Sequence, residues 1–135
     1  MIIMEKKILV VDDDISILDM LKEVFTSAGY TVLTAESAED ALNILINETV
    51  MVMFLDIRLP VMSGIELCKK IRMEDKISII HAFTGYSSLN GLLECRGVGF
   101  DDFFIKPARL EVLLKAAQDS FERLERWKIC DYGLG

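Results

Sequence analysis

Short apolar runs alternate with segments of helical periodicity five times along this chain, and no other feature constrains its fold as strongly. The first run, residues 8–11, has no polar residue within it, which is typical of a strand buried on both faces. We expect strands at residues 8–11, 30–35, 50–55, 77–83 and 103–105. Strands that alternate with helices connect by right-handed crossovers, so the pattern predicts an α/β doubly wound fold. Its five-stranded parallel sheet would have the order 2-1-3-4-5, with helices on both faces.

Helix starts are marked by capping residues. Asp14 is a candidate N-cap for the first helix, and Ser37 and Ser63 each begin a capping-box pattern. Gly91 interrupts the fourth helix, which we expect over residues 87–96, with a break at residues 97–99.

The last helix is expected to begin near Arg109 and to outrun the sheet. A helix of about 19 residues rises roughly 28 Å, which exceeds a short strand. Residues 128–135 show no periodicity, so we place the domain at residues 6–127 and expect a frayed tail or truncated linker after it.

The composition excludes several classes of function. The chain has 22 acidic against 15 basic residues, a formal net charge of -7, which argues against direct nucleic-acid binding and against anionic membranes. Its longest apolar run, residues 50–55, is far too short to span a bilayer. Three cysteines without a C-x-x-C pair fit a reduced, cytoplasmic chain.

Polar residues follow the apolar runs at positions that a parallel sheet brings to one edge. These are Asp12, Asp13, Asp56, Thr84 and Lys106. Any one of them alone would be an ordinary end of a strand, but three converging carboxylates repel one another unless a cation lies between them. Oxygen ligands suit Mg²⁺, or Mn²⁺, better than zinc, and a lysine beside the metal suits an anionic group.

The motifs that carry these residues resemble the receiver domain of two-component response regulators, over about residues 6–125. The matching stretches are Ile8-Leu9-Val10-Val11-Asp12-Asp13, Leu55-Asp56-Ile57-Arg58-Leu59-Pro60 with Gly64, Phe83-Thr84-Gly85 and Phe103-Phe104-Ile105-Lys106-Pro107. The resemblance implies a flavodoxin-like (βα)5 domain that is a signalling switch and catalyses only its own phosphorylation and dephosphorylation.

The resemblance also implies a role for each site residue. Asp56 would accept a phosphoryl group from the phosphohistidine of a sensor histidine kinase or a phosphotransfer protein. Asp13, Asp56 and the main-chain carbonyl of Arg58 would hold Mg²⁺, with Asp12 binding directly or through water. Lys106 would neutralise phosphoryl oxygens, and Lys106-Pro107 would be a cis peptide.

The remaining family positions concern the switch itself. Thr84 would turn toward the phosphoryl group while Phe103, at the switch aromatic position, swings inward. Phe103 lacks the hydroxyl of the tyrosine often found there, and Gly85 replaces the usual alanine and would keep the pocket open. Arg58 and Tyr86 would flank the phosphoryl group, with Tyr86 shielding it from water.

Other candidates have simpler interpretations. His81, the only histidine, is expected to be a satisfied core residue, and Cys68 to lie on the buried face of the third helix. Asp101 and Asp102 precede the fifth strand, so we expect them in a solvated turn or at a strand end, away from the metal site.

Three alternatives remain open. A haloacid-dehalogenase-type phosphatase also uses an aspartyl-phosphate but needs a second Asp where this chain has Arg58. A degenerate receiver would act without phosphorylation, although all five site residues are present. The chain could also be a receiver cut from a larger regulator or hybrid sensor kinase. Its output partner is unknown, and a homodimer through the fourth and fifth helices is conceivable.

Overall fold

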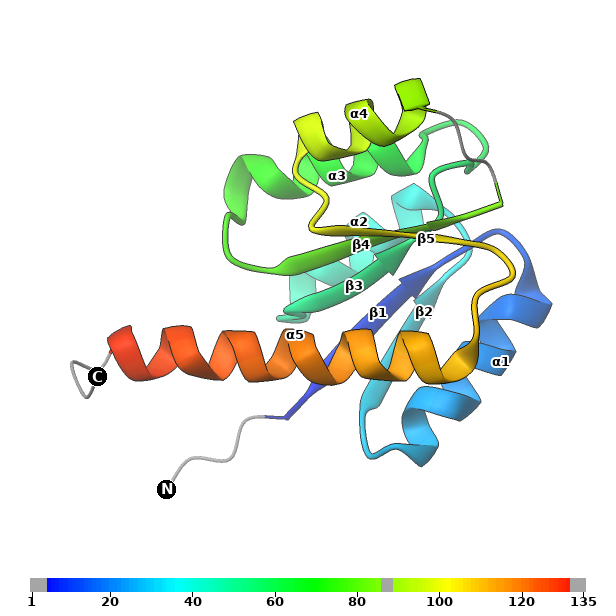
Figure 1. Ribbon diagram of the computed structural model, residues 1–135. Coiled ribbons are helices and arrows are strands. Elements are labelled where there is room, and N and C mark those ends of the chain that lie inside the picture. The colour runs from blue at the N-terminus through cyan, green and yellow to red at the C-terminus, as the bar shows by residue number, and fades with distance from the viewer. Residues whose placement is uncertain (1–4, 86–88, 132–135) are drawn as a thin grey trace.

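Five strands and five helices alternate along the described part of the chain (Figure 1). The computed structural model describes residues 5–85 and 89–131, without the side chains of residues 89, 90 and 128–131. The elements are β1 (Lys7–Val11), α1 (Ile15–Ser27), β2 (Thr31–Ala35), α2 (Ala38–Asn47), β3 (Val52–Leu55), α3 (Gly64–Glu74), β4 (Ile79–Thr84), α4 (Leu89–Val98), β5 (Asp102–Ile105) and α5 (Leu110–Asp131). All paired strands are parallel, in the order β2-β1-β3-β4-β5, so the predicted doubly wound fold is confirmed.

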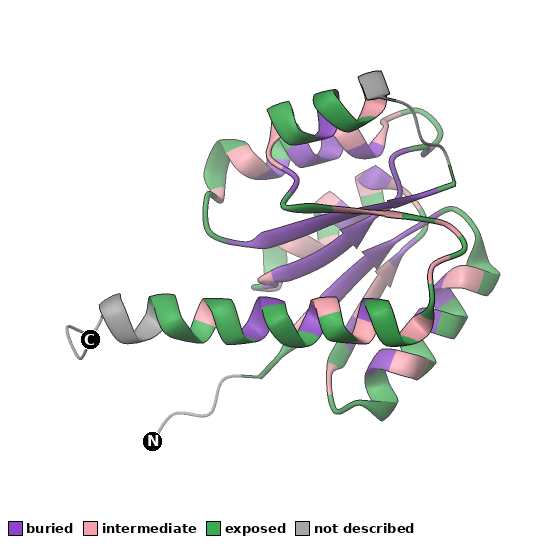
Figure 2. Cartoon of the chain, in the orientation of Figure 1, coloured by how far each residue is buried: buried purple, intermediate pink, exposed green. Residues whose placement is uncertain are grey.

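Two hydrophobic cores lie on the two faces of the sheet (Figure 2). Helices α1 and α5 cover one face, where Leu21, Phe25 and Leu113 are buried against Phe54. Helices α2, α3 and α4 cover the other face, where Leu67, Cys68 and Cys95 are among the buried residues. The three inner strands β1, β3 and β4 are buried nearly throughout, as expected for strands covered on both sides.

The predicted N-caps are confirmed. The Asp14 carboxylate accepts the N–H of Ser16 at the start of α1. The hydroxyls of Ser37 and Ser63 accept N–H groups three residues later, at the starts of α2 and α3. Each cap satisfies a donor that has no partner within the helix, so it sets the point at which the helix begins.

Several element boundaries differ from the sequence prediction; strand β3, for example, begins at Val52 and not at residue 50, and β5 begins at Asp102. Strand β4 begins at Ile79, because the Asp75 carboxylate accepts the N–H groups of Ile77 and Ser78 in a turn and leaves Ile77 exposed. Helix α4 continues through Gly97 to Val98, because the backbone reverses only at Gly99, where φ is +111°. Glycine tolerates that conformation, which other residues rarely adopt.

Helix α5 is longer than predicted. It continues to Asp131, so residues 128–131 are helical and not part of an irregular tail, and the domain boundary at residue 127 stays a prediction. Its C-terminal turns extend past the sheet in Figure 1, and Trp127 is 60% exposed there. None of the helices within the described residues is long and apolar enough to cross a membrane.

Candidate functional site

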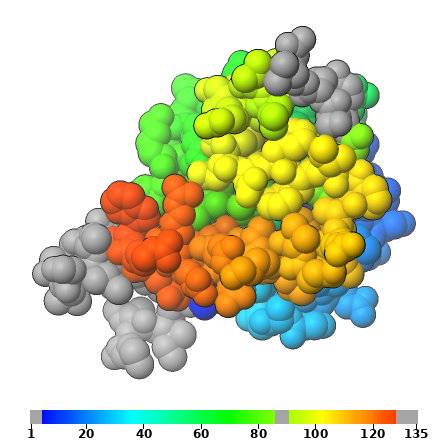
Figure 3. Space-filling view, viewed as in Figure 1, coloured from blue at the N-terminus to red at the C-terminus, as the bar shows by residue number. Residues whose placement is uncertain are grey.

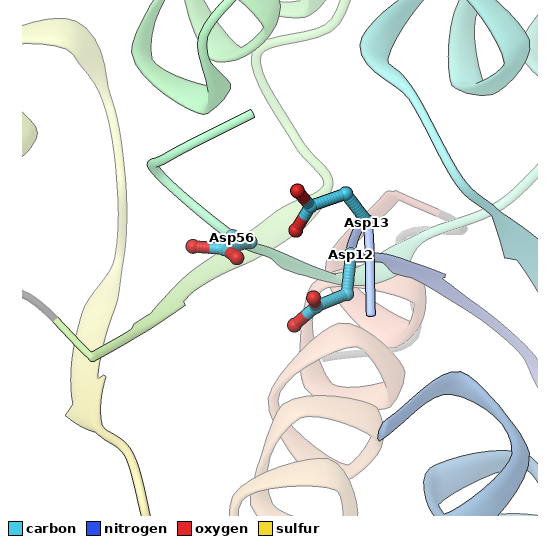
Figure 4. A group of neighbouring side chains, drawn as sticks. All are labelled: Asp12, Asp13 and Asp56. Atoms are coloured by element: carbon cyan, nitrogen blue, oxygen red, sulfur yellow. The ribbon is translucent and has the colours of Figure 1, made fainter. Parts of the chain in front are cut away.

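Three aspartates converge at the carboxyl edge of the sheet (Figure 4). Asp12 and Asp13 follow β1, and Asp56 follows β3. Because β1 and β3 are paired neighbours, with Val11 opposite Leu55, the residues after them are brought together. One carboxylate oxygen from each of the three aspartates lies within 4.8 Å of the others. Strand order therefore forms the acidic cluster that the sequence predicted.

Lysine 106 lies between two of these carboxylates. Lys106 Nζ is 2.5 Å from an Asp12 oxygen and 3.1 Å from an Asp56 oxygen. Both aspartates are buried, whereas Asp13 is exposed. Burial raises the pKa of Asp12 despite the hydrogen bonds it accepts from Lys106 and from the N–H of Asp14. Burial alone would lower the pKa of Lys106, but the two carboxylates more than offset it and raise that pKa.

The second oxygen of each buried aspartate accepts a backbone N–H. Asp12 accepts the N–H of Asp14 at 2.9 Å, and Asp56 accepts the N–H of Arg58 at 3.1 Å. These bonds hold each carboxylate in a fixed orientation, with its other oxygen directed at Lys106. Lys106 also lies over the Phe83 ring, 5.3 Å from its centroid, and precedes the cis peptide to Pro107.

The loop after Asp56 is shaped by a close approach that only glycine permits. A Cβ atom at Gly64 would lie 2.0 Å from the main-chain oxygen of Asp56, while the Gly64 N–H donates to Ile57 O at 2.8 Å. The first turn of α3 is thereby held directly against the residue that follows β3. Within this loop, Val61 has a φ of 67° and is 97% exposed, which is unusual for a β-branched side chain.

The donor set fits a hard divalent cation. Three carboxylates supply only oxygen ligands, and Asp13 leaves the cluster open to water. Mg²⁺ keeps several water molecules and commonly binds through one or two carboxylates, whereas zinc prefers nitrogen and sulfur. Among the described residues, no other group of three His, Cys, Asp or Glu side chains converges in this way. The cluster therefore suits Mg²⁺ or Mn²⁺.

The other predicted site residues lie around this cluster. Thr84 is buried at the end of β4, beside β5, and its carbonyl accepts the Lys106 N–H at 2.9 Å. Gly85 is exposed, and a Cβ added there would meet no other described atom within 4 Å, so glycine is not needed to keep this space open. Phe103 is half-buried and packs against the core beneath α2, α3 and α4. Tyr86 lies outside the described residues.

Asp101 lies at a strand end and His81 in the core, as expected, but both make contacts that the sequence does not reveal. Asp101 is not in a merely solvated turn: one of its oxygens accepts the N–H of Ile80 at 2.8 Å and pairs with Arg72 at 2.9 Å. His81 is buried as predicted, and its Nε2 lies 2.9 Å from Ser120 Oγ, but Nδ1 has no partner among the described atoms. It is therefore only half satisfied.

The sequence interpretation missed Phe83 as part of the site. The sequence places Phe83 in an apolar strand and in the Phe83-Thr84-Gly85 motif but gives it no role, because nothing in the order of residues shows that the Lys106 side chain lies over its ring. The role of Gly64 was carried by the motif alone, but a glycine inside a capping box is a signal of close backbone approach that could have been read.

Comparisons with known proteins agree with this geometry. The family model for the response regulator receiver domain matches residues 8–118. The uncharacterized transcriptional regulatory protein YrkP of Bacillus subtilis is 41% identical over 113 residues, which are 82% of this chain and 47% of YrkP. Sporulation initiation phosphotransferase F of the same organism is 32% identical over 115 residues, which are 85% of this chain and 93% of that protein. The chain thus spans about half of one relative and nearly all of the other.

Solved structures give the same assignment. A CheY-like response regulator receiver domain protein from Methanospirillum hungatei superimposes with a TM-score of 0.88 at 32% identity, over 91% of this chain and 98% of that one. The five-stranded order, the acidic carboxyl edge and the family match lead to one conclusion. The chain belongs to the response regulator receiver domain family, the signalling switches of two-component systems.

Proposed function

We propose that this domain accepts a phosphoryl group on Asp56 from the phosphohistidine of a sensor histidine kinase or phosphotransfer protein. The observation that carries the proposal is the position of Asp56, buried beside Asp12 with Lys106 bridging the two. An Asp56 carboxylate oxygen attacks phosphorus as the bond from phosphorus to the histidine nitrogen breaks, and the leaving imidazole retains the electron pair of that bond.

The residues of this chain mainly supply position and charge. The N–H of Arg58 holds one Asp56 oxygen, so the other faces the Lys106 ammonium. Lys106 is already located where phosphoryl oxygens would gather, and an ammonium held there in advance stabilises their charge without reorganisation. Thr84 lies at the end of the neighbouring strand, where its hydroxyl could bind the same oxygens.

Mg²⁺ would be held by Asp13, Asp56 and the main-chain carbonyl of Arg58, with Asp12 binding directly or through water. When bound, the ion neutralises phosphoryl oxygens and offsets the repulsion among the carboxylates. Lys106 already bridges Asp12 and Asp56, so a cation bound beside these carboxylates would compete for their oxygens and leave the ammonium available to the phosphoryl group.

The output surface would be the face formed by α4, β5 and α5 (Figure 3). Leu93, Ile105 and Val112 are exposed on these three elements, at 60%, 51% and 43%. Phe103 belongs to β5 and packs toward the α2–α4 core, so movement of Thr84 and Phe103 would reach this face. A partner, a further domain or a second copy of the chain would bind this face. The length of YrkP favours a receiver within a larger regulator, whereas sporulation initiation phosphotransferase F favours a stand-alone one.

The test is phosphorylation by a small acyl phosphate with Mg²⁺, followed by intact-mass measurement. We expect one added phosphoryl group, lost in Asp56→Asn and without Mg²⁺, and retained in the matched control Asp119→Asn, an exposed aspartate on α5. No adduct on the wild-type chain would contradict the proposal and favour a degenerate receiver.

The phosphatase alternative predicts a different readout. Such an enzyme would hydrolyse a phosphoester over many turnovers, whereas a switch takes up one group and releases it slowly. Arg58 stands where that class needs an acid, and it is exposed beside Asp56. We therefore expect no multiple turnover of a phosphoester under conditions that phosphorylate Asp56.

A further inference from the structure

The negative charge of this chain is concentrated in one part of it. Residues 8–57 contain ten acidic residues and a single basic one, Lys22, while the rest of the chain contains twelve acidic and fourteen basic residues. Those first residues form β1, α1, β2, α2 and β3, so the acidic part includes the β2 edge of the sheet and the two helices beside it. Three of the ten acids belong to the metal cluster, which leaves most of the excess unexplained.

A groove of about 550 Å³ lies within this acidic part, between α1 and α2 and over the end of β2. Its floor includes the buried Leu18 and Ala35, and Ile15 and Ile44 add aliphatic surface at its sides. Ile15 is 58% exposed, which is high for an isoleucine at a helix start. The groove is thus open to solvent and partly apolar, a form that suits an extended or helical segment of another protein better than a small molecule.

The charged residues of the groove all have the same sign. Asp19 on α1, Glu36 after β2 and Asp40 on α2 line it, and all three are exposed. None of the three has an ion pair among the described residues, and no Lys or Arg lines the groove. An apolar floor between unpaired carboxylates complements an apolar side chain flanked by cations.

We propose that this groove binds a basic amphipathic segment of a partner protein, with an aliphatic side chain on the floor and Lys or Arg beside Asp19, Glu36 and Asp40. Such a segment would satisfy three carboxylates that this chain leaves unpaired. The groove borders the acidic cluster, because Ala35 lies opposite Val11 and its carbonyl accepts the Asp12 N–H. It contains none of Asp12, Asp13, Asp56 and Lys106 and no residue of α4, β5 or α5, so we expect docking without phosphorylation. It would select partners by charge, because an acidic or neutral segment gains nothing from the three carboxylates.

The test uses a fluorescently labelled amphipathic peptide of leucine and lysine, with binding followed by anisotropy. Saturating Mg²⁺ is present to occupy the metal cluster, and a leucine–glutamate peptide is the charge-reversed control. The groove variant combines Asp19→Asn, Glu36→Gln and Asp40→Asn. The matched control combines Glu74→Gln, Glu94→Gln and Glu111→Gln, exposed acids on α3, α4 and α5 that change the net charge equally.

We expect the groove variant to weaken peptide binding about tenfold and the control variant by less than about twofold, since each exposed charge pair contributes modestly. Ile15→Ala should weaken it about threefold, because it removes aliphatic surface at the rim. Circular dichroism melts of each variant show that the fold is intact.

Equal weakening by both triple variants would overturn the proposal, because it would mean attraction to net charge alone. Loss of wild-type binding on adding Mg²⁺ would also overturn it, by locating the peptide at the metal cluster. Asp56→Asn should bind the peptide as tightly as the wild type does. The peptide experiment therefore tests the groove independently of the phosphorylation proposal.

Discussion

The two edges of the parallel sheet each hold a basic side chain among aspartates, but one edge is satisfied and the other is not. At the amino edge, Arg72 donates to the carbonyls of Gly99, Asp75 and Ser78 and pairs with Asp101. The same Asp101 oxygen accepts the N–H of Ile80. This cluster ties α3, the start of β4 and the turn before β5 together.

The carboxyl edge has the opposite balance. Three carboxylates share one ammonium, Lys106, and Asp12 is almost completely buried with a raised pKa. Such an arrangement costs stability until a cation or phosphoryl group rearranges it. The comparison teaches that similar ion pairs serve different purposes: a pair with every donor used holds the fold, and a pair with excess charge is available for chemistry.

Arg72→Met should have the largest effect on stability, because it removes every hydrogen bond that Arg72 donates at the amino edge. It leaves three carbonyls and a half-buried carboxylate without their donor, and we expect a loss of about 3 kcal/mol in the free energy of unfolding. Urea denaturation with and without Mg²⁺ measures it, and the loss should be independent of Mg²⁺. Arg123→Met is the control, since Arg123 lies 3.7 Å from Asp101 and is exposed. A loss below about 1 kcal/mol for Arg72→Met would show that the Arg72 cluster contributes little to the stability of the fold.

The titration of His81 shows how the buried interior of the sheet, between the two edges, responds to pH. Ser120 donates its hydroxyl to Ala116 O, so the hydrogen bond with His81 requires Nε2 to carry the proton. Nδ1 has no hydrogen-bond partner among the described atoms, and the imidazole ring packs against Phe54 and Phe104. Burial lowers the pKa of His81 to about 4, from 6.5. The histidine is therefore neutral in the fold, and its contribution is complete above pH 6.5 and lost as the pH falls toward 4.

We expect protonation of His81 to lower the free energy of unfolding by up to about 3 kcal/mol between pH 7 and pH 4. The measurement is the free energy of unfolding against pH for the wild type and His81→Gln, which cannot titrate. The variant should show a shallower decline over that window. Parallel curves would mean that acid acts through the edges of the sheet and not through its interior.

The elements could be predicted from local signals in the sequence, and the alternation of strands and helices indicated a doubly wound sheet, whose usual strand order makes the acids converge. Uninterrupted apolar runs and capping residues such as Ser37 and Ser63 specify elements, and a parallel sheet then brings the residues after β1 and β3 to one edge. The placement of Asp12, Asp13 and Asp56 needed no long-range information beyond strand order.

The amino edge could not be predicted in this way. Arg72 contacts residues 27 and 29 positions away, and its role depends on how α3 packs against the turn before β5. The same limitation explains Phe83, which lies beneath a lysine from another strand end. The predicted end of α4 is wrong because Gly97 resembles a helix break in sequence, whereas the residue with positive φ is Gly99. Glycine position alone does not distinguish the two.

Asp75→Asn should sharpen the comparison at the satisfied edge. Burial acts to raise the Asp75 pKa, but hydrogen bonds from the Ser78 hydroxyl and from the N–H groups of Ser78 and Ile77, together with Arg72, lower it. Its contribution is therefore present above pH 3.8 and lost as the pH falls through the lowered folded-state pKa. We expect the variant to lose about 1–2 kcal/mol at pH 7, and this loss should shrink as the pH falls below 3.8. A loss that persists in acid would point to packing and not to the charge.

Asp13→Asn should have the smallest effect and the opposite sign. Asp13 is exposed, shares its surroundings with two other carboxylates and has no ion pair among the described residues, so its charge only adds repulsion. Without Mg²⁺ we expect the variant to be more stable than the wild type by about 0.5 kcal/mol. With Mg²⁺ the order should reverse, because the wild type gains binding energy that the variant lacks. Thermal melts with and without Mg²⁺ test this, and Asp19→Asn, which changes an exposed aspartate on α1 outside the metal cluster, should show no such reversal. If Asp13→Asn destabilised the chain in both conditions, the carboxyl edge would be a structural cluster like the one around Arg72, and its excess charge would need another explanation.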